Sequence, residues 1–212
     1  ATSIASINAP LSSAFSSDLT YPIPNLTITA SLWIELGGTS NTTKNVIINS
    51  NITNTGGFSI TGANILLNGN LISPSAKIIT LKGNTTISAG KYIQCGGNFT
   101  QNGNLIFKSD ATGTASFGTL GGTYTTTSGT VTVERYIPAK RAFRFLSPSV
   151  TTTTTIKQNW QENAGTTAGL GTHITGTGGA TNGFDATSTN NPSLFAFANG
   201  AWSAVTNTNV NV

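Results

Sequence analysis

The strongest constraint on the fold of this chain is an internal repeat that runs from residue 25 to about residue 122. Asparagine recurs at intervals of 20, 19, 20 and 20 residues, and each copy begins a short phrase of similar composition. The first and third positions after the asparagine are apolar in nearly every copy, and the fourth position is polar. This alternation with a period of two is typical of β-strands. The five recurrent residues are Asn25, Asn45, Asn64, Asn84 and Asn104.

A repeat of this length cannot bury its apolar face alone, so neighbouring copies must stack on one another. We therefore predict a parallel β-helix with coils of about 20 residues, in which three short strands per coil pair with their equivalents one coil away. The recurrent asparagines are expected to form a structural ladder along one corner. Residues 32–36 and 92–95 are predicted to be second strands of their coils. A β-sandwich of short strands is the alternative fold, which the near-equal spacing disfavours.

The composition supports an all-β chain. Of its 212 residues, 37% are hydrophobic and 8% are charged, and that charged fraction is about a third of the usual share. Thr, Asn, Ser and Gly fill the polar positions, as in many bacterial extracellular and surface-array proteins. No apolar run reaches the ~18 residues that a membrane span needs. Residues 1 to 20 show neither the basic nor the apolar region of a signal peptide.

One candidate ligand face follows from the strand alternation. The eighth position after the recurrent asparagine is predicted to point outward, and it holds Trp33, Ile72 and Tyr92. An exposed stripe of this kind could bind sugar rings. The interpretation that we favour is that these side chains pack beneath a neighbouring loop or the N-terminal segment. Cys95, by contrast, is predicted to point inward and to act as a small buried hydrophobe.

The basic side chains are concentrated in one place. The chain carries ten Lys and Arg residues against six acids, for a net charge of +4. Four of the ten lie within ten positions: Arg135, Lys140, Arg141 and Arg144. We interpret this cluster as an interdomain site, where ion pairs and arginine stacking would seat the second domain on the end of the rod. A nucleic-acid interface would need a broader basic surface.

The sequence offers no convincing catalytic or metal-binding constellation. Glycosidases need two carboxylates at a fixed separation, whereas the only acids between residues 19 and 133 are Glu35 and Asp110. Coil stacking would place these two about 15 Å or more apart. In the second half Glu162, His173 and Asp185 lack an accompanying nucleophile motif. We therefore expect no enzyme activity, no cofactor and no metal, with a polysaccharide-active β-helix enzyme as a distant alternative.

Three segments are expected from the pattern. Residues 1–24 would cap the first coil or donate a strand to a neighbour, residues 25–130 would form the parallel β-helix, and residues 131–212 would form a β-sandwich-like domain. In that last segment Asn199 and Gly200 separate two strand-like phrases and are typical of a tight hairpin turn.

The second half also resembles a known group of proteins. The phrase VTVERYIPAKRAFRFLSPSV (residues 131–150), with IKQNWQE, GLGTHITG, NGFDAT and TNNPSLFAF after it, is similar to a recurrent region of large secreted Bacteroidota surface proteins of Flavobacteria-like type. The resemblance implies export by the type IX secretion system and an adhesin-like role. Such proteins usually continue into a C-terminal sorting domain. We therefore expect this chain to be a fragment or a processed form, with an incomplete second domain.

Together these features predict a secreted or cell-surface protein without catalytic activity, which acts as a β-helical stalk or adhesin. The expected partners are a surface glycan, a cell-envelope component or a second copy of the chain, together with the secretion machinery during export. Neither nucleic acid nor membrane insertion is expected. The alternative function is that of a self-assembling extracellular fibre subunit.

Overall fold

The computed structural model describes residues 19–21, 26–28, 32–35, 45–49, 51–54, 57–74, 76–138, 142–162 and 171–211. The chain divides into two compact units, Ala1–Pro138 and Ala139–Val212. We call them the solenoid unit and the C-terminal unit. Helix is limited, in the described part of the chain, to a π-helical turn at Lys157–Gln161 and a 3-10 turn at Gly179–Asn182.

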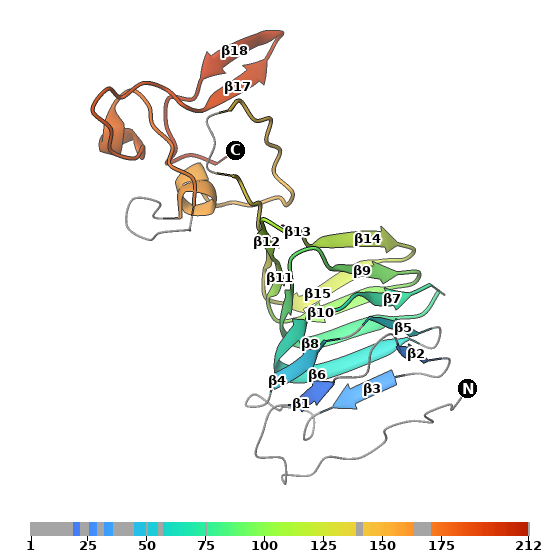
Figure 1. The fold of residues 1–212 in the computed structure, drawn as a ribbon. Helices are drawn as coiled ribbons and strands as arrows, with labels where there is room; N and C mark the ends of the chain where they lie inside the picture. Colours follow the sequence, from blue (N-terminus) through green and yellow to red (C-terminus); the bar gives the residue numbers. More distant parts are fainter. Residues whose placement is uncertain are drawn as a thin grey trace. The chain divides into compact units, whose positions relative to one another are not determined.

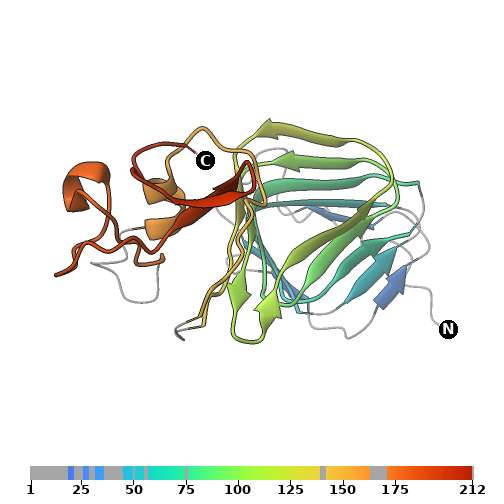
Figure 2. The same cartoon turned by 90° about the horizontal axis from the view of Figure 1, so that it is seen from above.

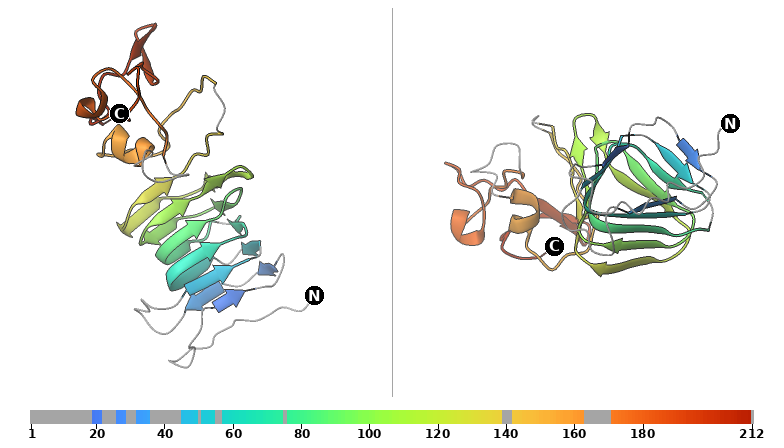
Figure 3. Two further views of the ribbon diagram at one scale, coloured as in Figure 1. Left: turned by 60° about the vertical axis from the view of Figure 1, so that its left-hand side comes forward. Right: turned by 90° about the horizontal axis from the view of Figure 1, so that it is seen from below.

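The solenoid unit is a parallel β-solenoid, as the repeat predicted (Figures 1 and 3). Its strands lie on three sides of a closed interior, which Figure 2 shows from above. Successive strands of each side pair in parallel, because the chain returns to the same side once per coil. Two long strands, β6 (Phe58–Leu67) and β8 (Ile79–Ile87), bend around a corner and so contribute to two sides.

The remaining strands follow the same three-sided path. The first side holds β1 (Leu19–Tyr21), β4 (Asn45–Ile48), β11 (Leu105–Phe107) and β16 (Val131–Val133), with the second halves of β6 and β8. The second side holds β2 (Leu26–Ile28), β5 (Ile52–Asn54), β7 (Leu71–Ser73), β9 (Tyr92–Cys95) and β14 (Ser116–Leu120). The third side holds β3 (Leu32–Glu35), the first halves of β6 and β8, β10 (Phe99–Asn102) and β15 (Tyr124–Ser128).

The predicted strand alternation is confirmed where side chains are described. The first and third residues after the recurrent asparagine point into the interior, and Val46, Ile48, Ile65 and Leu67 are buried there. The polar fourth position lies outside or half-buried. Among the described residues at these two inward positions, Thr85 is the one polar residue. Although it is fully buried, its hydroxyl donates a hydrogen bond to the carbonyl of Gly83 at 3.3 Å.

The asparagine register is confirmed for the later copies. Asn45 pairs with Asn64, and Asn64 with Asn84, at the same corner of successive coils. Residue 25 lies outside the described residues, but its neighbour Leu26 pairs with Ile52. The first phrase therefore belongs to the second side of the solenoid, whereas the repeat predicts that it lies on the first side.

Two further predictions about the first coil are wrong. Residues 32–35 form β3, which pairs with Phe58–Thr61 on the third side and is therefore not a second strand. Strand β1 pairs with β4, so the solenoid already includes Leu19, inside the predicted capping segment 1–24. The reason is a longer first coil: Leu19 pairs with Val46, a wider sequence separation than that between Val46 and Ile65.

The solenoid also extends past the predicted domain boundary near residue 130. Strand β16 pairs with β11, and Glu134 N donates to the carbonyl of Phe107 at 2.9 Å. The short hairpin of β12 (Ser109–Asp110) and β13 (Gly113–Thr114) lengthens this last coil, so the repeat is no longer visible in the sequence. The boundary between the two units falls after Pro138.

The C-terminal unit has a much smaller core. Ile156, Ile174 and Phe184 are buried together, and Trp160, Leu194 and Val205 pack against them. Its strands, in the part that the structure describes, are β17 (Phe195–Ala198) and β18 (Ala201–Ala204), which form one antiparallel pair. The predicted hairpin is therefore confirmed, whereas no second sheet of a sandwich is seen among these residues.

Candidate binding surface

The predicted ligand face does not form a stripe. Trp33 pairs with Ser59 on the third side of the solenoid, whereas Ile72 and Tyr92 belong to the second side. Ile72 pairs with Gln94, so Tyr92 is also out of register with it. The side chains of Ile72 and Tyr92 are half-buried. The turn before β9 is longer than the turn before β7, and constant spacing could not reveal that difference.

The predicted basic cluster is described only in part. Arg135 lies at the end of the solenoid unit, where its Nη1 donates to the carbonyl of Glu134 at 3.2 Å. Arg144 is exposed in the C-terminal unit. Lys140 and Arg141 lie outside the described residues. The role of this cluster in joining the two units stays a prediction.

The asparagine ladder is a structural feature of the solenoid. Asn64 Nδ2 donates to Asn45 Oδ1 at 2.7 Å, and further along the same corner Asn104 N donates to Asn84 Oδ1 at 3.1 Å. Thr130 N then donates to Asn104 Oδ1 at 3.1 Å. Each bond links one coil to the next, so the ladder adds side-chain hydrogen bonds to those of the parallel strands.

Sequence reasoning missed two further ladders at the next corner of the coils. In one, Asn68 Nδ2 donates to Asn49 Oδ1 at 2.7 Å. In the other, Asn70 N donates to Asn51 Oδ1 at 2.8 Å, and Tyr92 N donates to Asn70 Oδ1 at 3.1 Å. The pairs Asn49/Asn68 and Asn51/Asn70 are each 19 residues apart, and this spacing could have revealed the two ladders in the sequence. These side chains face one another along the stack and therefore serve cohesion.

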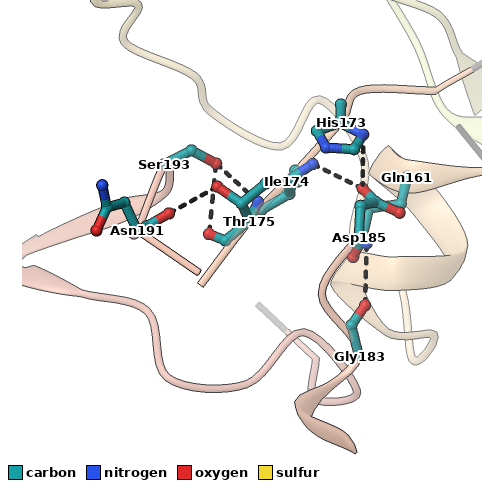
Figure 4. A network of polar contacts seen from close by, with 8 residues as sticks. All are labelled: Gln161, His173, Ile174, Thr175, Gly183, Asp185, Asn191 and Ser193. Carbon is teal, nitrogen blue, oxygen red and sulfur yellow. Dashed lines mark hydrogen bonds and ion pairs between the residues drawn. The ribbon is translucent and has the colours of Figure 1, made fainter. Parts of the chain in front are cut away.

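Two titratable residues of the C-terminal unit, His173 and Asp185, take part in the network of polar contacts shown in Figure 4. His173 Nδ1 lies 4.0 Å from Asp185 Oδ2, which also accepts a hydrogen bond from Ile174 N at 2.7 Å. Ser193 belongs to a separate contact, in which its Oγ accepts a hydrogen bond from Thr175 N at 2.9 Å. The carboxylate of Asp185 thus holds in place the segment that contains His173 and Ile174. We interpret the proximity of His173 and Asp185 as structural.

In the described residues, no three His, Cys, Asp or Glu side chains come together in a way that could hold a metal ion. Glu162, the third residue of the predicted constellation, is exposed and follows the π-helical turn with a left-handed backbone. None of the helices in the described part of the chain is long and apolar enough to cross a membrane.

The most conspicuous exposed apolar feature is a group of three rings in the C-terminal unit. Phe197 and Trp202 face each other across the β17–β18 pair with ring centroids 4.9 Å apart. Phe145 packs on the same Trp202 ring at 5.8 Å. The three residues are 60%, 56% and 86% exposed for Phe197, Trp202 and Phe145 respectively. We call these three residues the aromatic cluster.

The hairpin that carries two of these rings is defined locally. Asn199 and Gly200 have φ values of +52° and +77°, the positive values at both central positions that a type I′ turn requires. At its base, Val205 N donates to the carbonyl of Leu194 at 3.0 Å, and both side chains pack against the small core. The hairpin is thus anchored at its base, while its aromatic residues lie beyond the core.

Strand alternation sorts the hairpin side chains onto two faces. One face holds Phe195, Phe197 and Trp202, and the other holds Ala196, Ala198, Ala201 and Ser203. All of these residues are exposed. No charged residue occurs between residue 186 and the end of the chain. An uncharged apolar surface of this kind is a mark of an interaction site.

Comparison with known protein families, with curated proteins and with solved structures found no match. Two features of this chain bear on its function: the cohesive solenoid, in which charged residues are few, and the exposed aromatic cluster.

Proposed function

We propose that this protein is a non-catalytic structural and adhesive protein of the cell surface or extracellular space. In this proposal the solenoid unit serves as a stalk, and the aromatic cluster of the C-terminal unit makes the adhesive contact. The observation that carries the proposal is the mutual packing of three exposed rings, those of Phe145, Phe197 and Trp202, two of which stand on a hairpin without charged residues.

The solenoid has the properties that a stalk needs. Its parallel strands are continued from coil to coil, and side-chain ladders reinforce two of its corners. The interior is filled with aliphatic and aromatic side chains, each of which stabilises the fold by roughly 1.5 to 3 kcal/mol when fully buried. Because each coil contacts only its neighbours, such a stack can grow in length without changing its width.

The aromatic cluster suits contact with an uncharged partner. Exposed Trp and Phe rings contribute large apolar areas and little rotamer entropy to an interface. Asn and Thr side chains surround the hairpin in the sequence and can hydrogen-bond to hydroxyl groups of a partner. A surface glycan or another neutral cell-envelope component has this chemistry, and we propose it as the adhesive target.

A binding experiment tests the adhesive role. Labelled protein is applied to an array of neutral glycans and to purified cell-envelope preparations. We expect binding that falls at least tenfold in Phe145→Ala and in Trp202→Ala. Phe143→Ala is the matched control, because Phe143 is fully exposed and takes no part in the ring contacts of the cluster. Absence of binding by the unaltered protein would remove the adhesive role, and turnover of any polysaccharide would remove the non-catalytic one.

A second candidate function is that of a fibre subunit. In the described part of the chain, β14, β15 and β16 at the end of the solenoid each pair with another strand on one side only. Such open edges can accept the first coil of another copy, and a head-to-tail contact of this type builds filaments. Electron microscopy of the purified protein distinguishes the two functions: fibres with a regular axial repeat support assembly, and isolated short rods exclude it.

A further inference from the structure

The β17–β18 hairpin is a sheet that lacks neighbours. Within the described residues the two strands pair only with each other, so each has an outer edge of unpaired main-chain groups. An isolated two-stranded hairpin is marginally stable in water, and three or more strands are normally needed. Both of its faces are apolar and exposed, a pattern typical of strands covered on both sides.

We propose that β17 pairs with β17 of a second copy, antiparallel and around a two-fold axis at Ala196. The result is a four-stranded sheet in the order β18, β17, β17 of the second copy and β18 of the second copy. The main-chain register supports this arrangement. Ala198 is paired with Ala201 beside a two-residue turn, and Val205 N donates to the carbonyl of Leu194. Hydrogen-bonded pairs alternate with non-hydrogen-bonded pairs in an antiparallel ladder.

In that alternation, Phe195 and Phe197 occupy the non-hydrogen-bonded positions opposite β18. Their N–H and C=O groups therefore point away from β18. Pairing Phe195 of one copy with Phe197 of the other satisfies all of these outward groups in both strands. Ala196 then lies opposite Ala196 of the second copy in a non-hydrogen-bonded position. Antiparallel pairing of two identical strands about one residue has the two-fold symmetry of most dimers. The sequence Phe-Ala-Phe at 195–197 then places a phenylalanine opposite a phenylalanine on each side of the axis.

The composition of the edge favours a second copy as the occupant. Soluble proteins protect exposed edge strands with charged residues, proline or a bulge, and β17 has none of these. Like charges would meet one another across a two-fold axis, and residues 186–212 carry no charge. Pairing places the aromatic side chains of both copies on one face, because opposite residues of an antiparallel pair share a face.

This inference deepens the proposed function, and its adhesive consequence rests on that proposal. Each copy alone presents one aromatic cluster. The paired sheet presents both clusters on a single continuous face, so the binding surface would be completed only by the second copy. Two linked clusters also increase the strength of attachment to a repetitive surface through multivalency.

The test measures self-association of the full chain without any ligand. Sedimentation velocity and light scattering should give twice the chain mass. Ala196→Lys should give a single-chain mass, because the two new like charges then lie directly opposite each other at the axis. Phe143→Lys is the control and should keep the double mass, because Phe143 lies outside the hairpin.

A cysteine pair tests the register independently of any destabilising change. Ala196→Cys should form a disulfide-linked pair of chains under mild oxidation, because non-hydrogen-bonded Cα atoms lie about 4.5 Å apart. Ala201→Cys, on the strand away from the axis, should not. A single-chain mass at the highest soluble concentration, or cross-linking through position 201 in place of 196, would overturn the inference.

Surface binding separates this inference from the proposed function. A paired protein that binds no surface would uphold the pairing and overturn the adhesive role. A single-chain protein whose hairpin binds a neutral glycan or another protein would overturn the pairing. If the pairing and the adhesive role both hold, the cross-linked Ala196→Cys protein should bind glycan arrays at least tenfold more tightly than the Ala196→Lys protein.

Discussion

A Cβ atom at Gly83 would lie 1.9 Å from the carbonyl oxygen of Gly62, which occupies the same corner of the preceding coil. Gly83 also has a φ of +138°, a value that side-chain-bearing residues rarely adopt. We therefore expect Gly83→Ala to destabilise the solenoid by about 3 kcal/mol or more, through clash and backbone strain together. Urea unfolding followed by circular dichroism measures the change.

Gly90→Ala is the matched control for this prediction. Gly90 has a φ of +71°, but no other atom lies within 4 Å of the position that a Cβ atom would take there, so only the backbone strain remains. That strain costs about 1 to 2 kcal/mol. If the two substitutions lower the free energy of unfolding equally, close packing of the corner glycines is not what stabilises the coils.

The second prediction concerns the alternation of inward-facing and outward-facing side chains along β4 and the residue that follows it. Ile48 is 1% exposed, and Ile48→Asp would bury an unpaired carboxylate, at a cost of several kcal/mol beyond the lost apolar burial. We expect the solenoid not to fold. Asn49→Asp should change stability by no more than about 0.5 kcal/mol, since Asn49 is exposed and the new carboxylate keeps the acceptor oxygen that Asn68 uses.

The same comparison can be repeated one coil later with Leu67→Asp and Asn68→Asp. Asn68 donates to Asn49, so Asn68→Asp loses a donor and should be somewhat more harmful than Asn49→Asp. Folded yield and circular dichroism at each of the four positions provide the measurement. If Asp disrupted folding equally at the inward positions 48 and 67 and at the outward positions 49 and 68, the assigned register of the first side would be wrong.

How far the sequence could predict the fold depends on coil length. Between Asn45 and Asn104 the coils have nearly equal lengths, so paired apolar positions such as Val46 and Ile48 recur visibly. At both ends the coil is longer. The phrase at Leu26 was therefore assigned to the wrong side, and Val131 was assigned to the wrong unit. A constant residue spacing reveals the repeat only where the turns of successive coils have the same length.

The candidate site was less predictable for a different reason. The Asn199-Gly200 turn predicted the hairpin, and strand alternation places Phe197 and Trp202 on one face. Alternation does not say whether a face is covered, and apolar residues are usually interpreted as core. The predicted stripe of Trp33 and Tyr92 failed because it assumed one constant turn length.

The third prediction concerns Tyr124 in the last coil. Its ring stacks on Phe99 with centroids 5.7 Å apart, and its hydroxyl donates to Oε1 of the fully buried Gln101. Tyr124→Phe keeps the stacked ring but leaves the amide oxygen without this donor. An unsatisfied buried acceptor costs about 1 to 3 kcal/mol. Urea unfolding at neutral pH should show that loss relative to the unaltered protein.

The same residue predicts a pH dependence. Burial raises the pKa of Tyr124 above its ordinary value of 10.0. Above pH 10 the unfolded chain therefore loses this proton before the folded chain does, which favours unfolding. The contribution of Tyr124 is complete below the unfolded pKa and is lost as the pH rises through the folded pKa. The difference in stability between the unaltered protein and Tyr124→Phe should thus shrink in alkaline solution; a constant difference would contradict this origin.

The last prediction concerns Cys95, a free cysteine that is fully buried in the second side of the solenoid. Its Sγ lies 3.2 Å from the carbonyl oxygen of Asn98 and 3.4 Å from that of Gly97, so reagents reach it only when the coil opens. Opening a buried coil costs on the order of 5 kcal/mol, so thiol labelling should be roughly three to four orders of magnitude slower than in urea. The added thiol of Ala201→Cys is the exposed control and should react at once. If Cys95 reacted as fast as that thiol in the native protein, the second side would be open at β9 and the packing of β7, β9 and β14 around it would be wrong.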